Sequence, residues 1–352
     1  MCSTKKSMII VGAGIIGASI AYHLASRGIK VTVIDQAHPA SGATGSAFGW
    51  IHTTVSDDAP DALLRRASAE DWHRLEKEIP ELCIRWVGAL SYGADSPCEQ
   101  DESKMLQQSD ISRLEPAMNA PPSRAHYAGQ DGAMDPAEAT RTLLDKACCL
   151  GAELKTQTLV TGFRKEGNRI IGIETAEGII DADCVILACG TGITSLLSMI
   201  GITLPIVASP AILLRYRVTK HVVNTLISGD DIEVRHAFNG DLLAAEDYPV
   251  TGDTEAVASE TLTAIKSRLQ GTASAYLLKQ SIGQRPIPQD GHPVMGFIDD
   301  ITGIYVAVMH PGVTCAATVG RMVSEELTIG KNPEIPDSYR PTRLTTRSSG
   351  AY

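Results

Sequence analysis

The sequence predicts an α/β protein, α+β overall, that opens with a βαβ unit. Three observations support this. Residues 8–11, MIIV, form a short continuous apolar run, as in a buried strand. Glycines follow at positions 12, 14 and 17, and the apolar residues then repeat with helical spacing. Residues 29–35, IKVTVID, read as a second buried strand ending in an acid. This order of elements is typical of a dinucleotide-binding unit.

Each conspicuous residue of this unit has a physical reason to be there. Gly12 permits a tight turn, Gly14 lets backbone amides approach a diphosphate, and Gly17 lets the helix pack closely on the strand. The helix N-terminus adds partial positive charge. Asp35 can accept hydrogen bonds from both ribose hydroxyls and would repel a 2′-phosphate, which disfavours NADP. The unit alone does not distinguish NAD from FAD.

Composition limits the remaining classes of function. The 352 residues suffice for about two domains, and a net charge of −10 argues against a nucleic-acid partner. The eight cysteines include no CxxC pair and no HExxH motif is present, so we expect reduced thiols and no metal site. Glycines or prolines interrupt the uncharged runs 8–25 and 184–214. We therefore expect neither a signal peptide nor a transmembrane segment, and a cytoplasmic protein.

The later segments complete the α/β pattern in order. A loop of small residues, 41–51, presents many backbone amides to a long ligand. A helix begins near Pro136, and short strands lead to a buried strand at CVILAC, 184–189. Strands are predicted in 210–219 and 230–247, the latter with a hairpin turn at Asn239-Gly240. Finally IYVAV reads as a strand, MHPG as a turn, and the residues from Val313 as a helix.

These motifs together resemble the FAD-dependent amino-acid and amine oxidase family, which includes glycine oxidase, monomeric sarcosine oxidase and D-amino acid dehydrogenases. The resemblance covers residues 8–55 and 130–330 in pieces, whereas 56–129 contributes little. The pieces that carry it are VGAGIIGASIAYHLA, ATGSAFG, VILACG, GQRPIPQDGHPVMG and HPGVT.

The resemblance implies a Rossmann-like FAD-binding domain built from discontinuous segments and a substrate domain on a mixed or antiparallel sheet. The FAD-binding domain would comprise 1–75, 135–205 and 285–335, and the substrate domain 76–134 and 206–284. The polar tail 336–352 would wrap the surface or be disordered.

The resemblance also implies contacts with FAD along its whole length. The diphosphate would lie against Gly12, Gly14, Ile15, Ile16 and Gly17, and the adenosine ribose against Asp35 with the adjacent Gln36. The adenine would meet Val160, and Ala188 and Gly190 would support the cofactor at a strand end. The flavin side would meet Ala43, Thr44, Ala47, Gly49 and Trp50, and the flavin ring would meet Pro311, Gly312, Val313 and Thr314.

In such a family the flavin takes a hydride from the carbon that bears an amine, and the imine product hydrolyses. Arg285, in an RP motif, would bind the carboxylate of an amino acid. His310 and Tyr216 are further candidates for contact with the substrate or the flavin, and Arg235 and His52 are weaker ones. Tyr216 can equally be a core residue, because strand alternation puts it on one face with Leu214 and Val218.

Several alternatives stay open at this stage. Leu242 and Leu243 occupy the region where sarcosine oxidase has a lysine that assists the reaction with O₂, so oxidase and dehydrogenase are both possible. The electron acceptor is O₂ or another molecule. The chain could instead oxidise a 2-hydroxy acid, or serve as the FAD-bearing subunit of a larger dehydrogenase; it could also be NAD-linked. A homo-oligomer is also compatible with the sequence.

The sequence predicts that FAD is bound without a covalent bond. Ser46 stands where covalent members of the family have a histidine, and Cys315 lies within the last predicted helix as a packing residue. Denaturation of the purified protein should therefore release all of the FAD into the filtrate. Protein that stays yellow after denaturation and filtration would contradict this.

Overall fold

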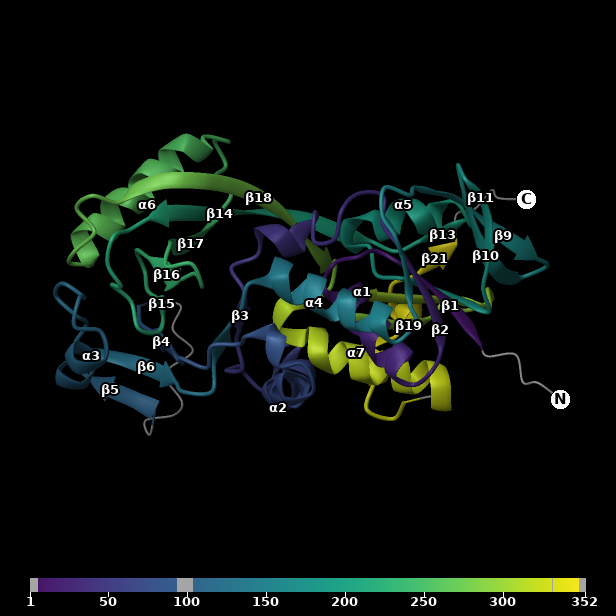
Figure 1. Ribbon diagram of the computed structural model, residues 1–352, viewed down its shortest axis with the longest axis horizontal. Helices are drawn as coiled ribbons and strands as arrows, with labels where there is room; N and C mark the ends of the chain where they lie inside the picture. Colours follow the sequence, from purple (N-terminus) through teal and green to yellow (C-terminus); the bar gives the residue numbers. More distant parts are fainter. Residues whose placement is uncertain (1–5, 94–103, 331, 348–352) are drawn as a thin grey trace. The chain divides into compact units, whose positions relative to one another are not determined.

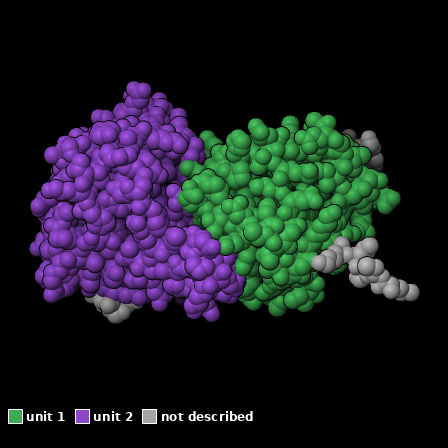
Figure 2. Space-filling view, viewed as in Figure 1, with its two compact units in different colours: residues 1–45, 136–209, 284–352 green, residues 46–135, 210–283 purple. Residues whose placement is uncertain are grey.

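The computed structural model describes residues 6–93, 104–330 and 332–347, which form two compact units (Figures 1 and 2). Unit 1 comprises 1–45, 136–209 and 284–352, and unit 2 comprises 46–135 and 210–283. The first boundary therefore lies at residue 45 rather than at the expected 75. The reason is that β3 (Trp50–Ile51) pairs with β7 (Gly132–Ala133), which draws the segment after residue 45 into unit 2.

A six-stranded sheet forms the centre of unit 1, in the order β19-β20-β12-β1-β2-β8. Strands β20, β12, β1, β2 and β8 are parallel, and β19 is antiparallel to β20. The nearly continuous apolar runs of these strands fit burial on both faces. The strands are β1 (Ser7–Val11), β2 (Lys30–Ile34), β8 (Glu153–Lys155), β12 (Cys184–Leu187), β19 (Val294–Phe297) and β20 (Ile304–Val308).

Helices and a smaller sheet cover this central sheet. Helix α1 (Ile15–Ser26) packs against α4 (Pro136–Cys149) and α7 (Gly312–Ile329). A further apolar cluster joins the central sheet to α5 (Ile193–Ser198) and to a three-stranded antiparallel sheet. That sheet contains β9 (Val160–Glu166), β10 (Arg169–Thr175) and β11 (Gly178–Asp181), and β13 (Ile202–Thr203) pairs with β21 (Thr346–Arg347).

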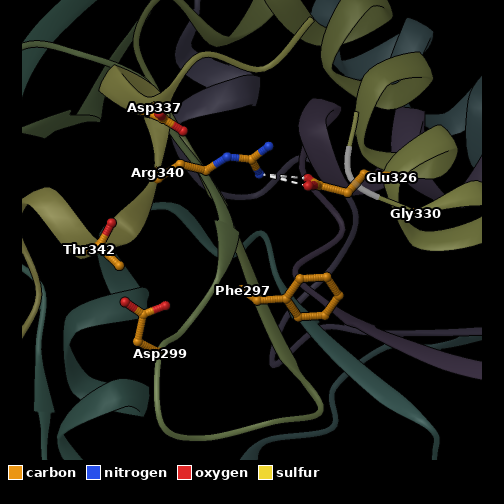
Figure 3. Close-up of a pocket in the computed structure, with 7 residues that line it drawn as sticks. All are labelled: Phe297, Asp299, Glu326, Gly330, Asp337, Arg340 and Thr342. Carbon is orange, nitrogen blue, oxygen red and sulfur yellow. Dashed lines mark hydrogen bonds and ion pairs between the residues drawn. The ribbon is translucent and has the colours of Figure 1, made fainter. Parts of the chain in front are cut away.

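The described part of the tail is fastened to unit 1. Arg340 donates two hydrogen bonds to the Glu326 carboxylate, at 2.7 and 2.9 Å, and Tyr305 donates one to the same group at 2.7 Å. Figure 3 shows Arg340 pointing at Glu326 in a pocket of about 340 Å³. The Glu326 side chain is 5% exposed, and burial beside this carboxylate raises the pKa of Tyr305. The described residues of the tail, up to 347, thus pack on unit 1.

A mixed sheet of eight strands organises unit 2, in the order β18-β14-β17-β16-β15-β4-β6-β5. Its described strand pairs are antiparallel except for β15 with β4. Both β14 and β18 continue into residues assigned to unit 1. The strands are β4 (Ala89–Ser91), β5 (Met105–Gln107), β6 (Arg124–Ala128), β14 (Ile206–Arg217), β15 (Leu226–Ser228), β16 (Glu233–His236), β17 (Leu242–Asp247) and β18 (Tyr276–Pro288).

One face of this sheet packs on α6 (Thr254–Arg268). Asp253 is the N-cap residue of this helix, and its carboxylate accepts from the Ala256 amide. Leu214 and Tyr216 of β14 lie in this core with Ala258 and Ile265 of the helix. Two more helices, α2 (Ala62–Glu78) and α3 (Gln108–Leu114), fall in the region where the resemblance contributed little.

The Arg340–Glu326 pair makes the tail a stabilising element of unit 1. Arg340→Met leaves a buried carboxylate without its cation, so we expect a loss of about 3–5 kcal/mol in the free energy of unfolding. Urea unfolding followed by circular dichroism measures it. The matched control is Arg164→Met, which breaks an exposed pair with Asp181 and should change stability by less than about 1 kcal/mol. Equal losses in the two variants would contradict this account of the tail.

Candidate cofactor and substrate site

Two glycines let backbone segments meet where side chains cannot fit. Gly12 has φ +113°, and a Cβ added there would lie 2.5 Å from the Ala188 carbonyl oxygen at the end of β12. A Cβ on Gly17 would lie 2.0 Å from the Gly12 oxygen. The turn after β1 is therefore pressed between α1 and β12, and any other residue at either position must displace backbone.

The N-terminus of α1 is left open by the same turn. Gly14 is the N-cap residue and has no side chain that could cap the helix, and no acid lies in the first turn. The Ile15 amide donates to the Thr44 hydroxyl at 3.2 Å. This contact brings the small-residue segment beside the helix end, although 29 positions separate the two residues in the sequence. A helix N-terminus without a carboxylate in its first turn is suited to an anion such as a diphosphate.

Asp35 is fixed by backbone amides on both sides of its carboxylate. Oδ2 accepts from the Ala13 amide and Oδ1 from the Ala37 amide, each at 2.8 Å. Each oxygen keeps a further lone pair for a ribose hydroxyl. The Thr158 amide donates to the Asp35 carbonyl at 2.9 Å, so the segment leading to Val160 starts beside this acid. Gln36 is exposed next to it.

A second helix N-terminus lies near the first. A Cβ on Gly312, the first residue of α7, would lie 3.8 Å from Ile16 Cγ1. Pro311 is the N-cap residue and gives no side-chain cap, and the first turn of α7 has no acid. Unit 1 thus directs two helix ends with partial positive charge toward neighbouring positions. Val313 and Thr314 are buried in the first turn, whereas His310 before it is exposed.

The RP motif lies close to the end of β12. A Cβ on Gly190, which has φ +58°, would be 3.8 Å from Pro286. Arg285 is partly buried, and its Nη2 donates to the Ser209 hydroxyl at 3.0 Å. Unit 1 therefore brings the glycine turn, Asp35, Thr44 and the two helix ends into one neighbourhood with this motif, as a site for a dinucleotide and a small anionic substrate requires.

The structure places Tyr216 in the core. It is fully buried on the α6 face of the unit 2 sheet, and its hydroxyl donates to the Ala258 carbonyl at 2.8 Å. Burial raises the pKa of Tyr216 above its usual value, so the phenol stays protonated. Of the two interpretations left open by the sequence, this placement favours the core residue over the catalytic one.

Residues 46–50, which include Ala47, Gly49 and Trp50, are held within unit 2 by buried polar groups. The Gly49 carbonyl accepts from the Met134 amide at 2.9 Å, and the Trp50 indole donates to Asp131 at 2.7 Å. Thr53 donates to the other Asp131 oxygen, from its hydroxyl at 2.6 Å and its amide at 3.0 Å.

His52 stacks on Trp50 with ring centroids 4.2 Å apart, and its Nδ1 lies 2.9 Å from Nη1 of Arg65. Burial first, and then Arg65, lower the pKa of His52 to about 3. Its imidazole is therefore neutral at physiological pH and cannot serve there as a proton donor in cationic form. The sequence did not point to Asp131, because its partners Trp50 and Thr53 lie 81 and 78 positions away in the chain.

This geometry is that of a dinucleotide-binding unit, and comparison with known proteins identifies the family. The family model described as DAO, FAD dependent oxidoreductase, matches residues 7–326. The chain belongs to this family and is an FAD-dependent oxidoreductase, as the resemblance predicted. The residues present fit FAD, since Gly12, Gly14 and Gly17 place no side chain over the backbone of the turn, and neither α1 nor α7 has an acid in its first turn that would repel a diphosphate or a reduced flavin.

Relatives of similar length support this placement. The chain is 26% identical to the uncharacterized oxidoreductase YurR of Bacillus subtilis, over 94% of this chain and 96% of that protein. It is 25% identical to the glycine oxidase of Bacillus licheniformis, over 91% and 92%. The fold is similar to that of L-proline dehydrogenase from P. horikoshii, with a TM-score of 0.84, 24% identity, and 96% and 97% coverage. Within the described part of the chain, no helix is both long and apolar enough to cross a membrane.

Substitution of Gly14 tests the glycine turn without backbone strain, although the Thr44 side chain must shift slightly. Its φ of −80° suits alanine, and the added Cβ would lie 3.2 Å from the Thr44 hydroxyl. We expect Gly14→Ala to fold normally and to weaken FAD binding at least about tenfold, or 1.4 kcal/mol, because the methyl group covers the open helix end. Fluorescence titration of apoprotein with FAD measures this. Exposed Gly129, changed to alanine, is the control; an unchanged affinity in Gly14→Ala would refute the role of this helix end.

Proposed function

We propose that the protein oxidises a C–N bond of an amino acid or a secondary amine. The observation that carries this proposal is the position of Arg285 beside the cofactor neighbourhood of unit 1, in the RP motif next to Gly190. A guanidinium at this place suits bidentate binding of a substrate carboxylate. The relatives named glycine oxidase, and the similar structure named L-proline dehydrogenase, support a substrate of this class.

The roles of the chain's own residues follow from their chemistry. Arg285 orients the substrate by binding its carboxylate. The Ser209 hydroxyl accepts a hydrogen bond from the Arg285 guanidinium and so restricts the orientation of that side chain. FAD, when bound, supplies the hydride acceptor. The open N-terminus of α7, at Gly312, stabilises negative charge that develops beside it during the reaction. The exposed His310 precedes this turn, and we propose that it contacts the substrate or the flavin.

The substrate loses its hydride most readily as the free amine, because a protonated nitrogen has no lone pair to form the C=N bond. The product imine then hydrolyses in water. None of these steps demands a strongly perturbed acid or base in the protein. The final electron acceptor is O₂ or another molecule.

Anaerobic bleaching of the flavin tests the proposal directly. The panel is glycine, sarcosine, proline, D- and L-amino acids, N-alkyl amino acids and 2-hydroxy acids, with ammonia or imine detection on each. We expect rapid bleaching by at least one amino or N-alkyl amino acid. Bleaching by 2-hydroxy acids alone would overturn the proposal. A flavin that no member of the panel reduces would also overturn it, and co-purifying chains would then point to a subunit of a larger dehydrogenase.

Removal of the guanidinium tests the role of Arg285. We expect Arg285→Ala to raise KM for a carboxylate substrate about tenfold to a hundredfold, because a charge-assisted pair is lost, with FAD still bound. Arg285→Lys should recover only part of the affinity, since it keeps the charge but not the bidentate geometry. Steady-state kinetics with flavin content as the control measures both. An unchanged KM in Arg285→Ala would exclude the assignment.

A further inference from the structure

The turn that follows the RP motif in unit 1 is joined to Arg285 by a stiff piece of chain. Two prolines, Pro286 and Pro288, come within three residues of Arg285, and β18 ends at the second of them. Each proline fixes its own φ and restricts the residue before it to extended backbone. The Gly291 amide then donates to the Pro288 carbonyl at 2.8 Å and closes the turn. A displacement of this turn is therefore passed on to Arg285, because the chain between them cannot absorb it.

The same turn leads to the edge of the unit 1 sheet at which α7 begins. It is followed by β19, which starts at Val294 and pairs antiparallel with β20 so that Val294 lies opposite Val308. Val308 is the last residue of β20, and Gly312 opens α7 four residues later. Residues 289–293 thus connect the RP motif to the strand end next to the α7 N-terminus, where the flavin ring is expected.

One arginine of the C-terminal tail holds this turn in place. Arg343 donates to both oxygens of the Asp290 carboxylate, from Nε at 2.7 Å and from Nη2 at 3.0 Å. Its Nη2 also donates to the His292 carbonyl at 2.7 Å, and its Nη1 donates to the Arg340 carbonyl at 3.1 Å. All three nitrogens of the guanidinium are therefore engaged. Such a planar fork fixes the direction of the carboxylate as well as its charge, which a lysine amine cannot do.

The Asp290 carboxylate organises the turn from within as well. Its Oδ1 accepts from the His292 amide at 3.1 Å, so one group receives both the backbone of the turn and the arginine of the tail. Burial acts to raise the pKa of Asp290, but the hydrogen bond and charge of Arg343, together with the His292 amide, outweigh burial and lower it. Asp290 and Arg343 are therefore both charged at physiological pH.

The segment that carries Arg343 is itself pressed against β19. A Cβ added to Gly296 would lie 2.7 Å from Cδ of Pro341, so the tail approaches this strand more closely than a side chain allows. Arg340 and Thr342 of the tail line one pocket with Phe297, the last residue of β19 (Figure 3). The tail therefore contacts both β19 and the turn before it, and Arg343 reaches that turn from a backbone that is already held.

We infer that Arg343 is a positioning residue for substrate binding: through Asp290 it holds the turn after the RP motif, and thereby the Arg285 guanidinium, in the orientation that receives the substrate carboxylate. This inference rests on the proposed function and adds to its site a residue from the far end of the chain. Arg343 acts through Asp290 rather than on the substrate. Because a guanidinium that is already oriented loses less conformational entropy on binding, loss of the Arg343 fork should weaken substrate binding.

Steady-state kinetics on variants of the pair test the inference. Arg343→Met should raise KM for the carboxylate substrate about tenfold while kcat stays within about twofold and FAD stays bound, because the contact to Arg285 is made alike before and during the reaction. Arg343→Lys should recover only part of the affinity. Asp290→Asn should raise KM similarly, and the double variant should be no worse than either single one, since each removes the same pair. The matched control is Arg321→Met, which breaks a pair with Glu334 in the same unit and should leave KM unchanged.

Two measurements without turnover separate this inference from the proposed function. Calorimetric titration of holoenzyme with acetate and benzoate should give a Kd about tenfold higher in Arg343→Met than in wild type, and hydrogen exchange at residues 284–293 should be faster. If no amine reduces the flavin but both Arg285→Ala and Arg343→Met weaken carboxylate binding, the proposed function fails and the positioning role stands. Faster exchange with unchanged Kd and KM would show a purely structural pair and overturn the inference, as would unchanged exchange. A wild-type enzyme that neither binds a carboxylate nor oxidises an amine would overturn both.

Discussion

The contact between the backbones of Gly12, Gly17 and Ala188 is the constraint on which unit 1 depends. At these positions the end of β1, the start of α1 and the end of β12 approach closer than any side chain allows. The close approach leaves the α1 N-terminus open at Gly14 and brings the Asp35 carboxylate onto the Ala13 amide. A site for an anionic cofactor therefore follows from packing, because the features that bind it are main-chain groups exposed by missing side chains.

Unit 2 uses its sheet differently on its two faces. The face on α6 is an apolar core in which even a tyrosine has its hydroxyl satisfied by a helix carbonyl. The opposite face holds charged groups, with Arg235 buried among backbone carbonyls and Asp241 shared between two arginines. Burial of Arg235 costs solvation free energy, which its hydrogen bonds to these carbonyls offset in part.

The local parts of this architecture could be predicted from the sequence, and the non-local parts could not. The strand at IYVAV and the hairpin turn at Asn239-Gly240 are set by residues within a few positions, and both are present. Strand alternation also showed which residues share a face with Tyr216, but not that α6 covers that face. Arg235 was only a weak candidate, since its carbonyl partners on Phe48 and Met134 lie about a hundred or more positions away. The first domain boundary was misplaced because the pairing of β3 with β7 leaves no mark in local composition.

A crystal structure of the protein with FAD tests the central claim most directly. The account predicts that the diphosphate lies over the amides at the start of α1, with ribose hydroxyls on Asp35 and the flavin ring against the first turn of α7 at Gly312. A diphosphate bound away from the turn at Gly12–Gly17, or a flavin ring distant from the N-terminus of α7, would contradict it.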